Sequence, residues 1–229
     1  MKKGSIAPGS RVAGVIVGKV TDSTVKKALR DGADILELRV DTFEDRDPER
    51  LKKTIKTIHG RLPLLITVRS MKEGGRNPIS DKKRVDIFEA LMPFADMIDI
   101  ELSSGGILKN VVSSARRHRK QVIISYHDFK STPGVKVLRE IVKKGIRNGG
   151  EIVKVATLVK GPEDLRNLAR ILSDFNNLIV IGMGEKGAAS RVFFPMLGSL
   201  LTYGSIAGST APGQLTLKDI KKELRRYGF

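Results

Sequence analysis

Residues 34–41 read Asp34-Ile35-Leu36-Glu37-Leu38-Arg39-Val40-Asp41, and this stretch decides the fold. Its apolar residues are those of a buried strand, yet Glu37, Arg39 and Asp41 stand at every second position. Side chains alternate between the two faces of a strand, so these three share one face. A polar edge strand would explain the pattern in an open sheet, but a closed barrel has no edge strand. In a barrel the charged face points into the interior.

Seven more apolar, β-branched runs accompany this one along the 229-residue chain. The eight runs begin near residues 12, 34, 63, 97, 121, 151, 178 and 200. The amphipathic segments between them open on helix-start signals, among them Thr21-Asp22, Asp47-Pro48-Glu49, Ser80-Asp81, Pro162-Glu163-Asp164 and Thr216-x-x-Asp219. Eight alternating units favour a (β/α)8 barrel forming one domain over residues 1–229, with an open doubly wound sheet as the alternative. Catalytic side chains are then expected at the carboxyl ends of the strands.

The composition excludes several classes of protein. The chain has no cysteine, which rules out disulfides, thiolate metal sites and a cysteine nucleophile. Apolar runs such as residues 178–181 are far shorter than the roughly 20 residues that span a bilayer. The first residues lack the pattern of a secretion signal. We therefore expect a cytoplasmic protein that does not act at a membrane.

The chain is strongly basic, since 42 Lys and Arg against 25 Asp and Glu give a net charge of +17. Such a charge attracts anions, whether nucleic acid, a membrane surface or a small acidic substrate. The densest basic stretches, residues 116–120 and 221–226, lie on helical patterns with few aromatic residues nearby. Base stacking would need aromatic residues there. Solvated helix faces are the favoured interpretation, and nucleic-acid binding is the alternative.

The sixth run contains an unusual lysine. Lys154 lies between valines in the middle of Glu151-Ile152-Val153-Lys154-Val155-Ala156-Thr157. Burying an ammonium without a partner is costly, so such a lysine is either paired with a carboxylate or partly neutral. A neutral amine is a nucleophile that can form an imine, and positive charge from Arg39 and Arg69 would favour that form. The alternative is a salt bridge across the barrel to Glu37 or Glu101.

Other candidate residues stand at the ends of strand-like runs. His127 ends the fifth run, and it is the candidate general acid and base because the ordinary histidine pKa lies nearest neutrality. A purely structural histidine is the alternative. Arg69 ends the third run before a Gly-Gly loop, which suits a flap that presents a fixed cation. Arg69 could instead extend to solvent at the rim, and Glu73 in that loop could be a solvated carboxylate.

Glycine-rich segments follow the seventh and eighth runs. Residues 182–187, Gly-Met-Gly-Glu-Lys-Gly, match G-x-G-x-x-G, but they come late in the chain and no acidic residue follows about 20 positions on. We therefore do not expect a dinucleotide site. Barrels often bind anions after strands seven and eight. Arg191 and the loop that contains Ser209 and Gln214 are the candidates to hold a carboxylate or phosphate.

Together these segments resemble the type I 3-dehydroquinate dehydratases, Schiff-base enzymes of the shikimate pathway. The similar motifs are E-L-R-V-D at 37–41, T-V-R-S-M-K-E-G-G at 67–75, S-Y-H-D-F at 125–129, K-V-A at 154–156, S-R-V at 190–192 and A-P-G-Q at 211–214. Their order spans nearly the whole chain. One departure is that residues 12–17 offer no serine for the substrate contact that the first strand of the bacterial pattern makes.

The resemblance implies roles for particular residues. Lys154 would form the imine, His127 would be the general acid and base, and Glu73 would be the carboxylate partner of His127. The residues implied in substrate binding are Glu37, Arg39, Arg69, Arg191, Ser209 and Gln214. The implied reaction, dehydration of 3-dehydroquinate to 3-dehydroshikimate, needs no metal and no organic cofactor, and the implied assembly is a homodimer.

Two other functions remain open from the residues. A class I aldolase would use the same barrel and the same imine-forming lysine, but it would cleave a carbon–carbon bond. A charge-driven nucleic-acid binder would bind in a salt-sensitive way and would not depend on Lys154.

Overall fold

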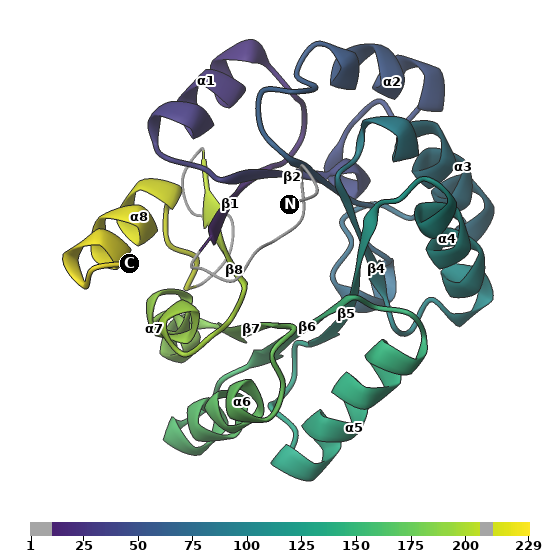
Figure 1. The fold of residues 1–229 in the computed structure, drawn as a ribbon. Coiled ribbons are helices and arrows are strands. Elements are labelled where there is room, and N and C mark those ends of the chain that lie inside the picture. The colour runs from purple at the N-terminus through teal and green to yellow at the C-terminus, as the bar shows by residue number, and fades with distance from the viewer. Residues whose placement is uncertain (1–10, 207–212) are drawn as a thin grey trace.

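Eight parallel strands form a ring in the computed structural model, which describes residues 11–206 and 213–229. Figure 1 looks along the axis of this ring. The strands are β1 (Arg11–Ile16), β2 (Ile35–Arg39), β3 (Leu64–Thr67), β4 (Met97–Glu101), β5 (Gln121–Asp128), β6 (Ile152–Leu158), β7 (Leu178–Met183) and β8 (Leu201–Ser205). Each begins within one residue of the position predicted from the sequence. The predicted (β/α)8 barrel is confirmed.

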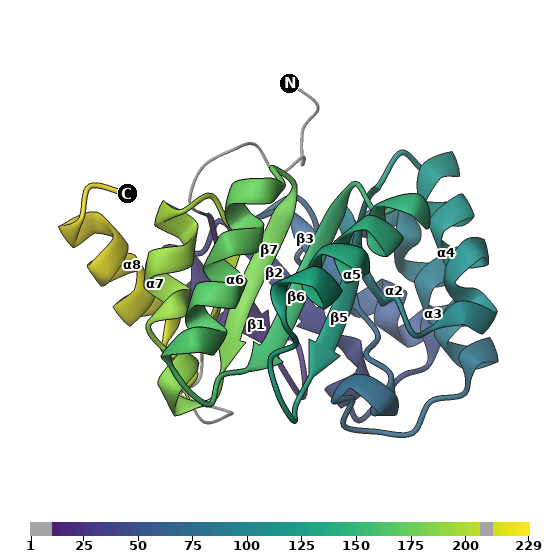
Figure 2. The ribbon, with the colours of Figure 1, turned by 90° about the horizontal axis from the view of Figure 1, so that it is seen from below.

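A helix follows each strand and packs outside the ring (Figure 1). The helices are α1 (Asp22–Arg30), α2 (Pro48–Lys56), α3 (Asp81–Leu91), α4 (Gly105–Arg117), α5 (Val135–Arg147), α6 (Pro162–Asp174), α7 (Ser190–Met196) and α8 (Leu217–Arg226). Within the described ranges, no helix combines the length and the apolar character needed to cross a membrane. Figure 2 shows the strand arrows directed to one end of the barrel, where their carboxyl ends gather.

The ring is nearly closed. Its strand order is β7-β6-β5-β4-β3-β2-β1-β8, with ladder hydrogen bonds between neighbours. β7 and β8, the two ends of this order, meet where they begin. There the Leu200 amide donates to the Leu178 carbonyl at 2.8 Å, and the Val180 amide donates to Ser199 Oγ at 3.0 Å. The barrel is therefore joined most loosely between β7 and β8.

Helix starts follow the capping residues that the sequence indicated. The side chains of Thr21, Asp47, Ser80 and Thr216 each accept a hydrogen bond from the backbone amide three residues later. A capping side chain satisfies an amide that the first helical turn leaves without a partner, which typically stabilises a helix by about 1 kcal/mol. These caps fix where each helix begins after its strand.

The barrel interior has an apolar floor beneath a polar layer. Ile35, Leu65, Met97, Ile123 and Ile152, on β2 to β6, belong to one buried cluster inside the ring. Two residues further along the same strands, and so on the same inward face, stand five polar side chains: Glu37, Thr67, Asp99, Ser125 and Lys154. The period of two read from residues 34–41 thus recurs in neighbouring strands, and it brings the polar groups together at one height.

Close packing of α8 on β8 depends on Gly204. A Cβ placed on Gly204 would lie 2.5 Å from the Cα and 2.7 Å from the amide nitrogen of Leu217, the first residue of α8. We expect Gly204→Ala to lower the free energy of unfolding by about 1–3 kcal/mol, because backbone must move to admit the methyl group. Urea denaturation measures the change.

Gly105→Ala is the matched control. A Cβ on Gly105, the first residue of α4, would meet no atom within 4 Å, so the stability should stay the same or rise slightly, since alanine favours helix more than glycine does. A Gly204→Ala protein as stable as the Gly105→Ala protein would contradict this packing.

Candidate active site

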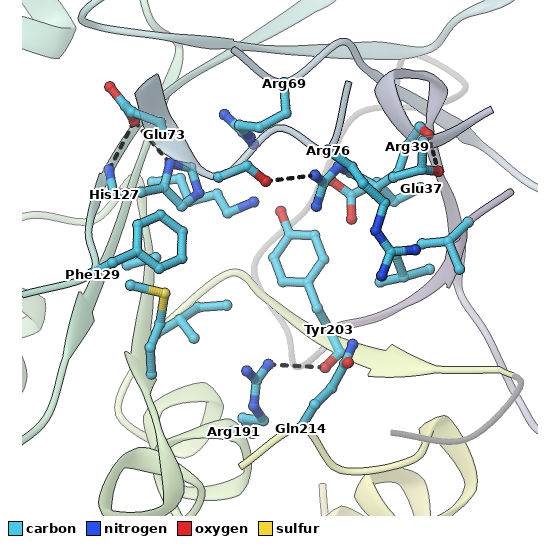
Figure 3. Close-up of a pocket in the computed structure, with 18 residues that line it drawn as sticks. Glu37, Arg39, Arg69, Glu73, Arg76, His127, Phe129, Arg191, Tyr203 and Gln214 are labelled. Atoms are coloured by element: carbon cyan, nitrogen blue, oxygen red, sulfur yellow. Dashed lines mark hydrogen bonds and ion pairs between the residues drawn. The ribbon is translucent and has the colours of Figure 1, made fainter. Parts of the chain in front are cut away.

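A cavity of about 300 Å³ opens at the carboxyl ends of the strands. It brings together eight of the nine residues that the sequence predicted for the site: Glu37, Arg39, Arg69, Glu73, His127, Lys154, Arg191 and Gln214. Figure 3, which labels all of these residues except Lys154, shows the labelled groups converging from opposite walls of the barrel. The ninth, Ser209, lies outside the described residues.

Lys154 stands at the bottom of this cavity, paired with a carboxylate. Its side chain is 7% exposed, and Nζ lies 3.2 Å from Asp99 Oδ2. Nζ also lies 4.2 Å from the centre of the Tyr203 ring. The salt bridge considered from the sequence was to Glu37 or Glu101, which was wrong: the partner is Asp99, on β4. The amine nonetheless lines the cavity, so it stays accessible to a ligand.

Asp99 holds two cations at once. Its Oδ1 lies 2.9 Å from Arg69 Nη2 and accepts a hydrogen bond from Ser125 Oγ at 2.6 Å. Burial alone would raise the pKa of Asp99, but the positive charges of Arg69 and Lys154 outweigh it and hold the pKa far below the ordinary value. Asp99 is therefore a carboxylate, and it separates the positive charges of Lys154 and Arg69.

Arg69 is embedded in the barrel, with only 3% of its side chain exposed. Its Nη1 lies 3.0 Å from Glu101 Oε1 and donates to Ser125 Oγ at 2.7 Å. Glu101 in turn pairs with the buried guanidinium of Arg84. The alternative of Arg69 extending into water is wrong. The positive charge of Arg69 was expected to favour a neutral Lys154, but Asp99 and Glu101 both face Arg69 and offset that charge.

Glu37 and Arg39 are held by different partners. Glu37 Oε1 accepts a hydrogen bond from Thr67 Oγ1 at 2.8 Å. Arg39 donates from Nε and Nη2 to the two oxygens of Asp41, each at 2.8 Å, and Nη2 also donates to the Gly74 carbonyl at 3.2 Å. Arg39 therefore ties the Gly-Gly loop after β3 to the mouth of the cavity.

His127, near the end of β5, is oriented by Glu73. One oxygen of Glu73, Oε2, accepts from the His127 backbone amide and lies 2.9 Å from Nδ1. The other oxygen, Oε1, accepts a hydrogen bond from Ser103. Since Glu73 is the acceptor at Nδ1, we assign the ring proton to Nδ1, which leaves Nε2 with a free lone pair. The loop glutamate is thus buried against the histidine, and its alternative as a solvated carboxylate is wrong.

The pKa values of this pair shift in opposite directions. Burial lowers the pKa of His127 well below 6.5, and the positive charges of Arg69 and Lys154 lower it further. Burial raises the pKa of Glu73, although the hydrogen bond from Ser103 and the charge of Arg69 oppose the rise. His127 is therefore a neutral imidazole near neutral pH, which is the form that accepts a proton.

Arg191, at the start of α7, lies on the opposite wall (Figure 3). Its Nε donates to the Gly213 carbonyl at 3.1 Å and its Nη1 donates to the Tyr203 carbonyl at 3.2 Å. No carboxylate within residues 11–206 or 213–229 pairs with it, and burial lowers its pKa to about 10. Arg191 thus remains a cation near neutral pH, and Gln214 lines the cavity beside it. Such a cation can hold an anionic group of a ligand.

The glycine-rich segment after β7 serves close packing. A Cβ on Gly187 would lie 2.5 Å from the carbonyl carbon of Gly182. Ser190 Oγ, at the start of α7, donates to the Gly187 carbonyl at 2.7 Å and accepts from the Gly182 amide at 2.9 Å. These contacts fold the segment back on itself and deliver Arg191, one residue later, to the cavity.

Comparisons with known proteins identify the family. The family model described as type I 3-dehydroquinase matches residues 18–228. The chain belongs to this family. The 3-dehydroquinate dehydratase of Aquifex aeolicus is 40% identical over 204 residues, covering 88% of this chain and 91% of the relative. That of Methanosarcina mazei is 37% identical over 223 residues, covering 92% of each chain.

Solved structures agree with this membership. The crystal structure of the Aquifex aeolicus enzyme matches with a TM-score of 0.87 at 36% identity, covering 95% of this chain and 98% of that one. The Geobacillus kaustophilus 3-dehydroquinate dehydratase matches with a TM-score of 0.88 at 28% identity, covering 97% and 91%. The resemblance read from the motifs is thus confirmed, and so is the prediction of an enzyme of the hydro-lyase class. This membership favours that class over the aldolase and the nucleic-acid binder.

The buried charge of Asp99 predicts a pH-dependent stability. We expect Asp99→Asn to lower the free energy of unfolding by about 3–5 kcal/mol near neutral pH, because Lys154 loses its buried counter-ion and Arg69 keeps only Glu101. The low pKa of folded Asp99 stabilises the wild type above the ordinary carboxyl value of 3.8, and this contribution is lost as the pH falls below that value. The difference between the two proteins should therefore shrink in acid, as measured by urea denaturation at about pH 7, 5 and 3.

Asp174→Asn provides the control, since Asp174 pairs with Arg139 at the surface and exposed pairs contribute little. An Asp99→Asn protein with the stability and the pH dependence of the wild type would refute the role of Asp99 as the shared counter-ion.

The environment of His127 predicts its titration. We expect its imidazole to protonate with a midpoint below the ordinary 6.5, because burial and the nearby positive charges disfavour the imidazolium. NMR of protein with labelled histidine measures the midpoint, and a His127→Gln protein assigns the signal among the three histidines. A midpoint at or above 6.5 would be incompatible with this environment.

Proposed function

We propose that this protein dehydrates 3-dehydroquinate to 3-dehydroshikimate in the shikimate pathway, through an imine formed by Lys154. The observation that carries the proposal is that the amine of Lys154 lines a cavity together with a neutral His127 and with Arg191, a cation that has no carboxylate partner among the described residues. Family membership supports the substrate, since the curated relatives cited above bear the name of that activity.

The first step is attack by Lys154 on the ketone carbon. The amine must lose its proton before it attacks. Asp99 accepts the hydrogen bond from the amine but is a poor proton acceptor, because its pKa is held so low. His127 is the better base in this cavity. It lies on β5, the strand that pairs with the β6 strand of Lys154. Addition gives a carbinolamine. His127 then returns the proton to the hydroxyl of this carbinolamine, which departs as water, so the protonated imine forms and His127 is neutral again.

The second step is the elimination itself. The imine withdraws electrons, so it acidifies the neighbouring carbon–hydrogen bond. Nε2 of His127 takes that proton, and the resulting enamine expels the hydroxyl group from the next carbon. His127 returns its proton to this leaving group, which departs as water. Glu73 keeps the ring of His127 in position through Nδ1. Hydrolysis of the product imine then restores Lys154.

Substrate binding is proposed for both walls of the cavity. Arg191 would hold the substrate carboxylate, assisted by Gln214 and by Ser209. On the opposite wall, Glu37, Arg39 and Arg69 would bind the ring hydroxyls. Glu37 and Arg69 are buried. Thr67 holds the carboxylate of Glu37 and Asp99 holds the guanidinium of Arg69, so both offer fixed hydrogen-bonding groups rather than mobile ones. Such fixed groups orient the ring for attack.

Further features of the enzyme are proposals of the same kind. The catalytic domain would comprise the whole of residues 1–229, act in the cytoplasm and use neither a metal nor an organic cofactor. Neither nucleic acid nor a membrane would be a partner. A homodimer is proposed from the family resemblance. Three exposed apolar side chains offer a surface for such a contact: Phe193 on α7, Leu197 directly after α7, and Tyr227 directly after α8.

Replacing Lys154 tests the proposal. We expect Lys154→Met to reduce turnover of 3-dehydroquinate by at least about 1000-fold, because methionine fills the same space without the amine. The fold should persist, since Asp99 keeps Arg69 and Ser125 as partners. Turnover and thermal unfolding are measured on the same samples.

The matched control is Lys136→Met, on the exposed side of α5, which should keep the activity of the wild type. Turnover by Lys154→Met close to that of the control would reject the proposed mechanism. A wild-type protein inactive on 3-dehydroquinate would reject the proposed substrate.

A further inference from the structure

The hydroxyl of Tyr203 is an unusual group in this cavity. Tyr203 lies on β8 and is 5% exposed, and its Oη has no hydrogen-bond partner among the described residues. The ring lines the cavity. Figure 3 shows it standing in the middle of the site, with the hydroxyl directed away from β8 toward the wall that contains Arg69. A polar atom is thus buried at the centre of the site without a partner in the part of the chain that the structure describes.

Packing does not explain this hydroxyl. A buried hydroxyl without a partner destabilises a fold, because it has lost its hydrogen bonds to water. A phenylalanine ring would fill the same volume in the barrel interior without that loss. Buried polar groups that stay unsatisfied in a native protein often serve a ligand. The hydroxyl of Tyr203 is therefore best explained by a partner that arrives with the substrate.

The position of Lys154 indicates which substrate atom this partner is. Nζ of Lys154 lies over the Tyr203 ring, 4.2 Å from its centre. The carbon that bonds to Nζ must therefore also come to lie beside this tyrosine. The oxygen already attached to that carbon is only one bond further away, so it too would lie near this tyrosine.

We propose that Tyr203 Oη donates a hydrogen bond to the oxygen of the carbon that Lys154 attacks, and thereby stabilises the negative charge that develops on this oxygen as the carbinolamine forms. The bond that forms is between Nζ and the carbon, the electron pair of the carbon–oxygen double bond moves to the oxygen, and Tyr203 keeps its proton. Tyr203 is in this role a catalytic residue, and the proposal rests on the proposed function.

The protonation state of Tyr203 suits this role. Burial raises the pKa of its phenol well above the ordinary 10, and the negative charges of Glu37 and Asp99 raise it further. The phenol therefore remains a neutral donor throughout the working pH range. A fixed neutral donor aimed at a developing oxyanion is an effective way to lower an addition barrier inside a protein.

Several other polar groups that line the cavity already have a partner or a task. Glu37 accepts from Thr67, Arg39 pairs with Asp41, and Glu73 binds His127 and Ser103. Lys154 itself becomes the nucleophile, and His127 is required for proton transfer from carbon. Tyr203 thus supplies a donor for the oxygen while leaving these groups to their own tasks.

Tyr203→Phe tests this inference, since it removes one oxygen and keeps the ring beneath Lys154. Imine formation with 3-dehydroquinate is followed in single turnovers stopped with borohydride, and the reduced adduct is quantified by mass spectrometry. We expect imine formation and kcat/KM to fall at least tenfold. The thermal midpoint should stay the same or rise, because an unsatisfied buried hydroxyl is removed.

Tyr126→Phe is the matched control, because Tyr126 lies on β5 outside the lining of the cavity and its hydroxyl contacts Asp128. It should form the imine at the rate of the wild type. Imine formation by Tyr203→Phe within twofold of this control would overturn the inference, even if KM rises, because the hydroxyl would then bind another part of the substrate. A wild-type protein that forms no adduct would instead overturn the proposed function and the inference with it.

Discussion

The carboxylate of Asp99 is the group on which the rest of the site depends. It lies inside the barrel between Lys154 and Arg69, and each of these cations would be costly to bury without it. The alternation of charge continues from Arg69 to Glu101 and on to Arg84, which links the polar centre of the barrel to helix α3. Because every member is fixed by its neighbours, the amine of Lys154 is held at one place. That placement, above the apolar floor and at the lining of the cavity, leaves the amine accessible to a ligand.

Many of the basic side chains that give the chain its net charge lie away from the cavity. Basic side chains stand in the last turns of α1, α2, α4, α5 and α8. Cations there interact favourably with the partial negative charge at the end of a helix. Helices run antiparallel to the strands they follow, so these last turns lie at the end of the barrel opposite the cavity. Inside the cavity, by contrast, Arg69 and Arg39 are matched by carboxylates, whereas Arg191 has no carboxylate partner within residues 11–206 and 213–229. The local arrangement, rather than the net charge, determines what the site can bind.

Local sequence patterns were sufficient for much of the architecture. The strand starts and the caps at Thr21, Asp47, Ser80 and Thr216 depend on neighbours in sequence, so periodicity and capping chemistry predict them. The convergence of Lys154, His127 and Arg191 followed from the rule that strand ends meet on one face.

The partner of Lys154 could not be predicted in this way, because it depends on which inward-facing side chains of different strands meet across the barrel interior. Asp99 stands two residues before Glu101 on the same strand, so the alternation of side chains places both carboxylates on the same face. It does not indicate which of them pairs with Lys154. Tyr203 was missed for a similar reason, because an aromatic residue in an apolar run predicts only core packing. That its hydroxyl has no partner among residues 11–206 and 213–229 becomes evident only once its surroundings are known.

The central claim is that the amine of Lys154 bonds covalently to substrate, and chemical trapping tests it most directly. The wild-type protein is incubated with 3-dehydroquinate, reduced with borohydride, digested and mapped by mass spectrometry. A stable adduct confined to the peptide that contains Lys154 is the predicted result. Full turnover with no reducible adduct, or an adduct on a different lysine, would contradict the claim.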